Sequence, residues 1–176
     1  MKAMIIYDSF FGNTEQVARA MGDALGSQAD VNVLRVGDVR PEHLTGVNLL
    51  IVGSPTRSFS PTPAIKKFLR NIPRRGLQGV RVAAFDTRIA LSDIDSRLLS
   101  VLVRVFGYAA KPIADGLAKE AGELALSPEG FFVKGTEGPL KEGELERATE
   151  WAKQIIQGKN EKLVAQFPVR PSADHT

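Results

Sequence analysis

The chain has 176 residues, of which 43% are hydrophobic and 24% charged, a composition typical of one globular domain. It contains no cysteine, which excludes disulfides, thiol catalysis and cysteine-bound zinc or iron–sulfur centres. The net charge is +3, and part of the positive charge gathers within residues 66–75, where we expect a solvated helix face or, alternatively, a docking patch for an acidic partner or an anionic ligand.

Neither a signal peptide nor a membrane span is expected. Only five apolar residues, 3–7, precede Asp8, which is too few for a signal peptide. No apolar run reaches the roughly 20 residues that a membrane span needs. Nucleic acid is not an expected partner, because no nucleic-acid-binding motif is visible. We therefore expect a cytoplasmic protein.

Apolar runs and helical periodicities alternate in the first half of the chain. Residues 49–52 are continuously apolar and lie between Asn48 and Gly53, which is typical of a parallel strand buried on both faces. Asn13 with Gln16 resembles a capping box at the start of a helix. The first half thus predicts strands over 3–7, 31–36, 49–52 and 80–85, helices over 13–25 and 64–71, and a short helix or turn over 41–46.

The same alternation continues in the second half. A helix with an apolar stripe is predicted from Ser92, followed by a helix over 109–121, a strand fragment near Leu124, a fifth strand over 131–133 and a last helix over 144–156. The stripe that predicts this helix consists of Ile94, Leu98, Leu102 and Val105, and the last helix is expected to bury Leu145, Ala148, Trp151 and Ile155. For the wider apolar set Leu98, Leu99, Leu102, Val105 and Phe106, two alternatives remain, a buried core helix or the interface of a homodimer.

Strands that alternate with helices, the central ones apolar on both faces, predict one α/β domain with an open parallel sheet covered on both sides. From Gly158 the chain becomes polar and contains proline, which predicts a tail over 158–176 that lies on the surface or is disordered. Ligands of such sheets bind beyond the carboxyl ends of the strands. The loops expected to form a site are therefore 8–14, 53–63 and 86–92.

The first of these loops has the features of an anion site. Ser9 and Thr14 supply hydroxyls, and Gly12 lets a ligand approach the backbone closely. The amides of residues 10–14 lie at a helix N-terminus, where free N–H groups and the helix dipole favour an anion. The loop is neither a Walker loop nor a dinucleotide fingerprint, because it lacks the Gly-Lys-Ser/Thr ending and the further glycines. The alternative is a strand–helix turn that binds nothing.

Three segments resemble the flavodoxin family. Residues 9–14, Ser-Phe-Phe-Gly-Asn-Thr, are similar to the loop that holds the FMN phosphate, although Phe11 stands where the family usually has a second hydroxyl. Residues 53–56, Gly-Ser-Pro-Thr, are similar to the segment beside the ribityl chain and the isoalloxazine ring, and residues 85–88 stand where the family contacts the pyrimidine edge of the flavin. The resemblance implies a three-layer α/β/α fold over 1–157, with a five-stranded parallel sheet in the order 2-1-3-4-5.

The resemblance also implies FMN as the cofactor and assigns residues to it. Ser54 and Thr56 are candidates for ribityl hydrogen bonds or only cap their turn, and Phe59 is a candidate for stacking on the flavin or only anchors its loop. The implied cofactor-binding residues are Ser9, Phe10, Phe11, Gly12, Asn13, Thr14, Ser54, Pro55, Thr56, Arg57, Phe59, Asp86, Thr87 and Arg88.

The third loop departs from typical electron carriers, because no aromatic residue lies between Asp86 and Leu91. With Arg57 and Arg88 close to the expected flavin, we hypothesise a cofactor that is less reducing than in low-potential flavodoxins and more open on one face. The alternative is that both arginines point into solvent or pair with Asp86 or Asp93.

We expect an FMN-dependent electron-transfer protein that serves redox partner proteins or a small-molecule electron acceptor. Two alternatives remain, an FMN-dependent NAD(P)H:quinone-type reductase and a flavodoxin-like binding module that has lost FMN. No catalytic or metal-binding residue is expected, because neither His43 nor His175 has a partner for a triad or a metal site.

Overall fold

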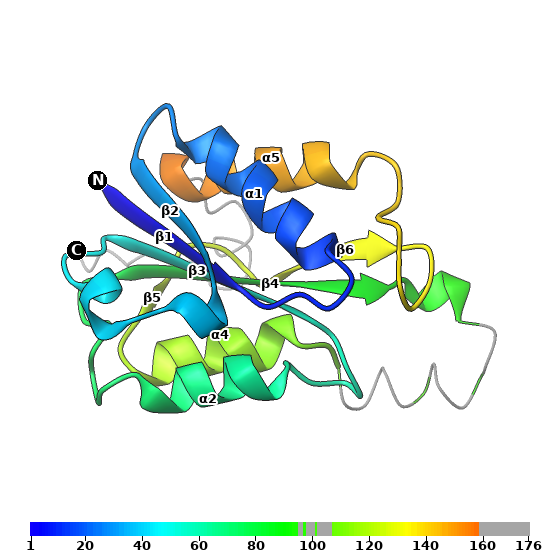
Figure 1. Ribbon diagram of the computed structural model, residues 1–176, viewed down its shortest axis with the longest axis horizontal. Helices are drawn as coiled ribbons and strands as arrows, with labels where there is room; N and C mark the ends of the chain where they lie inside the picture. The colour runs from blue at the N-terminus through cyan, green and yellow to red at the C-terminus, as the bar shows by residue number, and fades with distance from the viewer. Residues whose placement is uncertain (95–96, 98–100, 102–106, 159–176) are drawn as a thin grey trace, which may run out of the picture.

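The apolar runs of the sequence form one parallel sheet in the computed structural model, which describes residues 1–94, 97, 101 and 107–158 (Figure 1). Its strands are β1 (Lys2–Tyr7), β2 (Asp30–Arg35), β3 (Leu49–Pro55), β4 (Arg81–Ile89), β5 (Glu123–Leu124) and β6 (Glu129–Val133). The order β2-β1-β3-β4-β5 confirms the predicted 2-1-3-4-5 topology. The fifth position is split, because β5 pairs with the start of β4 and β6 with its end.

Helices cover both faces of the sheet. Helices α1 (Asn13–Leu25) and α5 (Glu144–Gln157) lie on one face, and α2 (Pro63–Asn71) and α4 (Ala110–Lys119) lie on the other. Short 3-10 turns form η1 (Val36–Asp38), η2 (Pro41–Leu44) and η3 (Leu91–Asp93). The predicted three-layer α/β/α arrangement is therefore confirmed. Among the residues that the structure describes, no helix is long and apolar enough to cross a membrane.

Each face of the sheet has its own core. On the α1/α5 side, the ring of Phe131 lies edge-on to Phe85 and Trp151, with centroids 6.0 and 6.2 Å apart. On the α2/α4 side, fully buried Leu50 of β3 packs with Ile65 and Ile113. The central strands are buried on both faces, as their continuous apolar runs predict.

Two local predictions were wrong, and one lies outside the described residues. Leu145 is 37% exposed, because the buried face of α5 runs through Ala148, Trp151, Ala152 and Ile155 and residue 145 lies off it. No capping box forms at α1: Gly12 is the N-cap and makes no side-chain cap. Of the apolar stripe predicted on the helix from Ser92, residues 98, 99, 102, 105 and 106 fall outside the described part of the chain.

Candidate functional site

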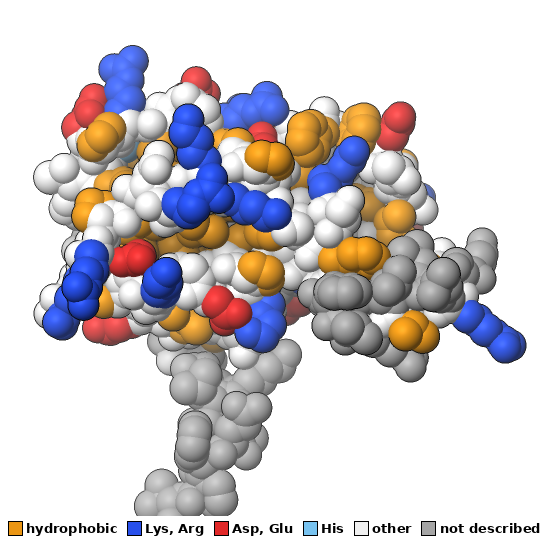
Figure 2. Space-filling model, turned by 90° about the horizontal axis from the view of Figure 1, so that it is seen from below, with side chains coloured by type: hydrophobic (Ala, Val, Ile, Leu, Met, Phe, Trp, Pro, Cys, Tyr) orange, Lys and Arg blue, Asp and Glu red, His pale blue; other side chains and the backbone are white. Residues whose placement is uncertain are grey.

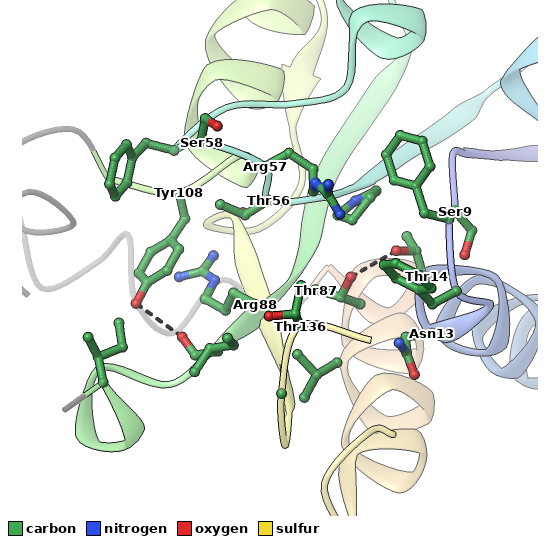
Figure 3. A pocket seen from close by; sticks show the side chains of 18 residues that line it. Ser9, Asn13, Thr14, Thr56, Arg57, Ser58, Thr87, Arg88, Tyr108 and Thr136 are labelled. Carbon is green, nitrogen blue, oxygen red and sulfur yellow. Dashed lines mark hydrogen bonds between the residues drawn. The ribbon is translucent and has the colours of Figure 1, made fainter. Parts of the chain in front are cut away.

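The loops that follow β1, β3 and β4 surround a cavity of about 490 Å³ at the carboxyl edge of the sheet (Figure 3). This is the edge where parallel α/β sheets bind ligands. Every cofactor-binding residue expected from the sequence lines this cavity except Gly12, Ser54 and Asp86. Those that line it are Ser9, Phe10, Phe11, Asn13, Thr14, Pro55, Thr56, Arg57, Phe59, Thr87 and Arg88.

The loop between β1 and α1 is fixed by a hydrogen bond within it and by one from β2. Gly12 has a left-handed backbone with φ of 84°, which glycine adopts without strain. Its amide donates to Ser9 Oγ at 3.0 Å, and Arg35 Nη2 donates to the Ser9 carbonyl at 2.7 Å. Within the described part of the chain, the amides of Asn13, Thr14 and Glu15 have no acceptor. The positive end of α1 is therefore available to an anion.

Two side chains at the start of α1 join it to distant segments. The hydroxyls of Thr14 and Thr87 lie 2.8 Å apart, which connects the first and third loops. Asn13 does not cap the helix as expected but donates from Nδ2 to the carbonyl of Glu137, at 2.9 Å, in the turn after β6. Both side chains are buried, so this end of the cavity is held from three elements.

Ser54 and Asp86 lie beneath the cavity and support its walls. Ser54 Oγ accepts from the amide of Thr62 at 3.0 Å and donates to the carbonyl of Pro55 at 3.0 Å, which folds the second loop back on itself. Asp86 is fully buried and accepts at Oδ2 from the amide of Ala110, at 2.7 Å, in the first turn of α4. A carboxylate at this position stabilises the helix N-terminus.

Arg88 is bound to Asp86, which is one of the alternatives that the sequence left open. Arg88 Nη2 donates to Asp86 Oδ2 at 2.8 Å, and Arg88 Nε donates to the other carboxylate oxygen. Burial raises the pKa of the Asp86 carboxyl, while the Arg88 charge and the Ala110 amide act in the opposite direction. Asp93 is not the partner of either arginine; it pairs with Lys141 at 2.5 Å.

The mouth of the cavity carries exposed aromatic rings. Phe10 and Phe11 are 55% and 48% exposed, and the Arg57 guanidinium lies 5.2 Å from the centre of the Phe10 ring. Ser58 and Phe59 both have positive φ, 46° and 63°, in a turn closed by mutual hydrogen bonds between the backbones of Arg57 and Ser60. This tight turn holds the second loop over the cavity.

Several lining residues were missed by the sequence analysis. The most important is Tyr108, whose ring lies 3.9 Å from the Arg88 guanidinium and whose hydroxyl donates to the Ile89 carbonyl at 3.4 Å. Nothing in the local sequence places a residue just before α4 beside the third loop. The turn after β6 could have been found, since it follows a parallel strand. The lining residues that were not assigned to the cofactor are Ser58 and Ile89, which lie in two of the predicted loops, and Ile94, Tyr108, Val133, Gly135 and Thr136, which lie outside them.

The arrangement fits a ligand with an anionic end and a flat apolar body. Free helix amides face one end of the cavity, while Pro55, Phe59, Tyr108 and Val133 contribute apolar wall. The described residues include no group of three or more His, Cys, Asp or Glu that could hold a metal ion. Flavin mononucleotide has both of the required parts.

The comparisons with known proteins agree with this geometry. Residues 5–151 match the family model described as flavodoxin. A probable flavodoxin 1 of Bacillus subtilis (strain 168) is 24% identical over 130 residues, which cover 73% of this chain and 80% of that protein. A flavodoxin from the domain Archaea superposes with a TM-score of 0.70 at 23% identity, over 91% of this chain and all of that one. Flavodoxin 2 of Bacillus cereus superposes with a TM-score of 0.72 at 20% identity, over 89% and 99% of the two chains. The chain therefore belongs to the flavodoxin family.

Proposed function

We propose that the cavity at the carboxyl ends of β1, β3 and β4 is where this flavodoxin holds FMN, and that the protein carries electrons between partner proteins. Flavodoxins bind FMN and transfer electrons. The observation that carries the assignment is the set of free amides at the start of α1, on Asn13, Thr14 and Glu15, where Asn13 and Thr14 line a cavity with apolar walls. When bound, FMN supplies the electron-transfer chemistry.

The phosphate end of FMN fits the start of α1. Residues 9–14 contain no lysine or arginine, so the attraction for a phosphate comes from the amides, the helix dipole and the Thr14 hydroxyl. Ser9 acts indirectly, because its Oγ already accepts from the Gly12 amide and so shapes the loop. Phe11, which replaces the usual second hydroxyl, contributes its amide and lines the mouth.

The ring end of FMN fits between the second and third loops. Phe59 and Tyr108 offer aromatic surface there, and Thr56 and Thr87 offer hydroxyls. Since Asp86 neutralises Arg88, the cation that is left without a carboxylate among the described residues of this site is Arg57. The proposal of a less reducing flavin therefore depends on Arg57. We also propose a cytoplasmic location, which the absence of cysteine favours.

FMN and riboflavin test the phosphate site, because they differ only in the phosphate. The purified protein is titrated with each flavin, desalted, and its visible absorption recorded. We expect FMN to remain bound and riboflavin to wash out. Thr14→Val should weaken FMN binding by about 10-fold, the effect of one hydrogen bond, and leave the binding of riboflavin unchanged. Ser27→Ala, in an exposed turn, is the control.

A second assay tests the carrier role. The FMN-loaded protein is photoreduced and mixed with oxidised cytochrome c, and its oxidation of free NADPH is measured separately. A carrier reduces the cytochrome and leaves NADPH unused, whereas a reductase consumes NADPH by itself. A protein that stays colourless after desalting would overturn the proposal.

A further inference from the structure

Charge is segregated along this chain. Residues 43–85 contain no aspartate or glutamate and seven basic residues. Because the whole chain has a net charge of +3, the remaining residues carry a net charge of −4. The basic residues of the acid-free segment are Arg57, Lys66, Lys67, Arg70, Arg74, Arg75 and Arg81.

Helix α2 carries three cations and no acidic residue. Three cations on other helices pair within one turn of their own helix: Arg19 with Glu15 at 2.7 Å, Lys111 with Asp115 at 2.7 Å and Lys153 with Glu150 at 2.8 Å. Lys66, Lys67 and Arg70 are exposed and have no ion pair with any described residue. Their charges therefore add to one another instead of being cancelled locally.

An apolar groove runs beside these cations. The connection from β2 to β3 contains only η1 and η2 in the place where a crossover helix would cover the sheet, and a groove of about 700 Å³ lies between it and α2. Its walls include Leu44, Phe68, Ile72 and Leu77, and its charged lining residues are Arg40 and Lys67. Figure 2, which looks onto the face of α2 and α4, shows Lys and Arg side chains gathered beside hydrophobic ones.

The groove and the cations extend toward the proposed flavin site. Helix α2 begins at Pro63, directly after the loop whose residues 55–59 line the cavity, and Thr62 caps it by accepting the Ile65 amide at 3.3 Å. Arg57 adds a further cation at the mouth. A protein seated on α2 would therefore lie next to the opening of the flavin cavity.

We infer that α2 and the adjoining groove form a docking surface for an acidic redox protein, which places carboxylates against Lys66, Lys67 and Arg70 and an apolar side chain in the groove. The charges select an acidic surface, and a concave apolar pocket beside them suits an anchoring side chain of a protein. Electron exchange with this partner rests on the proposed function. Docking of the partner does not.

Binding to two redox proteins of opposite charge tests the inference. Calorimetry of the FMN-loaded protein is carried out with plant-type [2Fe–2S] ferredoxin, which is acidic, and with cytochrome c, which is basic, at low and at physiological ionic strength. We expect ferredoxin to bind, and its affinity to fall as the salt concentration rises, since salt screens exposed charges. The triple variant K66Q/K67Q/R70Q should bind ferredoxin about 10-fold more weakly.

The matched control removes the same three charges elsewhere. The variant R19Q/K111Q/K153Q also loses two lysines and one arginine, from α1, α4 and α5, and should change ferredoxin affinity by less than about 3-fold. Leu44→Ala tests the groove; it should weaken the binding of ferredoxin without altering how that binding depends on salt. None of these residues lines the flavin cavity, so FMN absorption serves as the check on folding.

Equal affinity of ferredoxin for the two triple variants would overturn the inference. The inference would also be overturned if the protein bound phosphatidylserine vesicles through Lys66, Lys67 and Arg70 and did not bind ferredoxin, since the surface would then face a membrane. If ferredoxin binds through α2 while the protein takes up no FMN, the docking surface stands and the proposed function fails. If the protein binds FMN but not ferredoxin, the proposed FMN site stands and the docking surface is overturned.

Discussion

Gly53 shows how a single missing side chain fixes the centre of the sheet. It lies in β3 directly opposite Phe85 of β4, and the Phe85 ring occupies the space that a Cβ at position 53 would take. Phe85 in turn packs edge-on against Phe131, so the ring cannot move aside without disturbing the α1/α5 core. The glycine at the end of the apolar run is therefore required by packing rather than by backbone conformation.

Gly53→Ala is expected to lower the free energy of unfolding by about 3 kcal/mol, the upper range for overpacking a tight core. Gly37→Ala is the matched control, because no atom lies within 4 Å of the added methyl group and its φ is not positive. Urea denaturation of both variants checks the prediction. A Gly53 variant as stable as the control would show that the Phe85 ring can repack.

Asp86→Asn is expected to have two effects. The amide oxygen still accepts from Ala110, but Arg88 loses its counter-charge, and breaking such a pair should cost about 3 kcal/mol of stability. In the FMN-loaded protein the freed positive charge should raise the midpoint potential of the flavin. Denaturation and redox titration measure the two effects.

Asp115→Asn is the control for both measurements, because its exposed pair with Lys111 should contribute less than about 0.5 kcal/mol. An unchanged or lower potential in the Asp86 variant would mean that the Arg88 charge does not act on the flavin.

The sequence predicts which residues line the cavity better than it predicts which atoms these residues form hydrogen bonds with. Loop motifs identified Thr14 and Thr87, but not that their hydroxyls bond each other. Asn13 was expected to cap α1 and instead bonds a carbonyl 124 residues away. Tyr108 was missed because its closeness to Arg88 arises only when α4 packs under β4. Such contacts depend on tertiary packing, which short motifs do not encode.

Among the elements, the ends of the central strands differ most from the prediction. Strands β3 and β4 were expected to stop at 52 and 85, where the apolar runs end, yet they continue to Pro55 and Ile89. The extension is possible because buried Ser54 and Asp86 pair in the parallel ladder and their side chains bond within the fold. The apolar pattern locates a strand but not its polar end, and in this sheet the polar ends support the site.

The ion pair between Lys141 and Asp93, which joins the segment after β6 to η3, should be lost at low pH. Lys141, after β6, donates to Asp93 of η3, and this hydrogen bond holds the pKa of Asp93 below its ordinary value of 3.8. An acid with a depressed pKa contributes stability that is complete above the unfolded-state pKa and is lost as the pH falls toward the folded-state pKa. The stability from this link is therefore present at neutral pH and lost below about pH 4.

Lys141→Gln should raise the pKa of Asp93 toward 3.8, as measured by NMR titration of its carboxyl carbon. Lys134→Gln, an exposed lysine in the same connection, should leave that pKa unchanged. An Asp93 that titrates alike in both variants and in the parent protein would show that the link does not form in solution.

At the scale of the whole molecule, α5 is the last described element that packs against the sheet. The C-cap amide of Gly158 donates to the Ile155 carbonyl at 3.4 Å, and α5 covers its face of the sheet through Trp151 and Ile155. We therefore propose that residues 1–157 form the FMN-binding domain and that 158–176 is a tail outside it.

A chain ending at Gly158 should keep its free energy of unfolding to within about 0.5 kcal/mol and bind FMN as the full chain does. Thermal and urea unfolding, together with an FMN titration, measure this. A loss of several kcal/mol would show that the last 18 residues belong to the folded unit.

The segregation of charge also gives the molecule a permanent electric dipole. Unpaired cations lie on the α2 side of the sheet, while α1 and α5, on the opposite side, each carry one more acidic than basic side chain. In the field of an acidic protein such a dipole experiences a torque before any contact is made. The molecule would then rotate during its approach, so that a larger fraction of collisions begins with α2, and the flavin opening beside it, facing the partner.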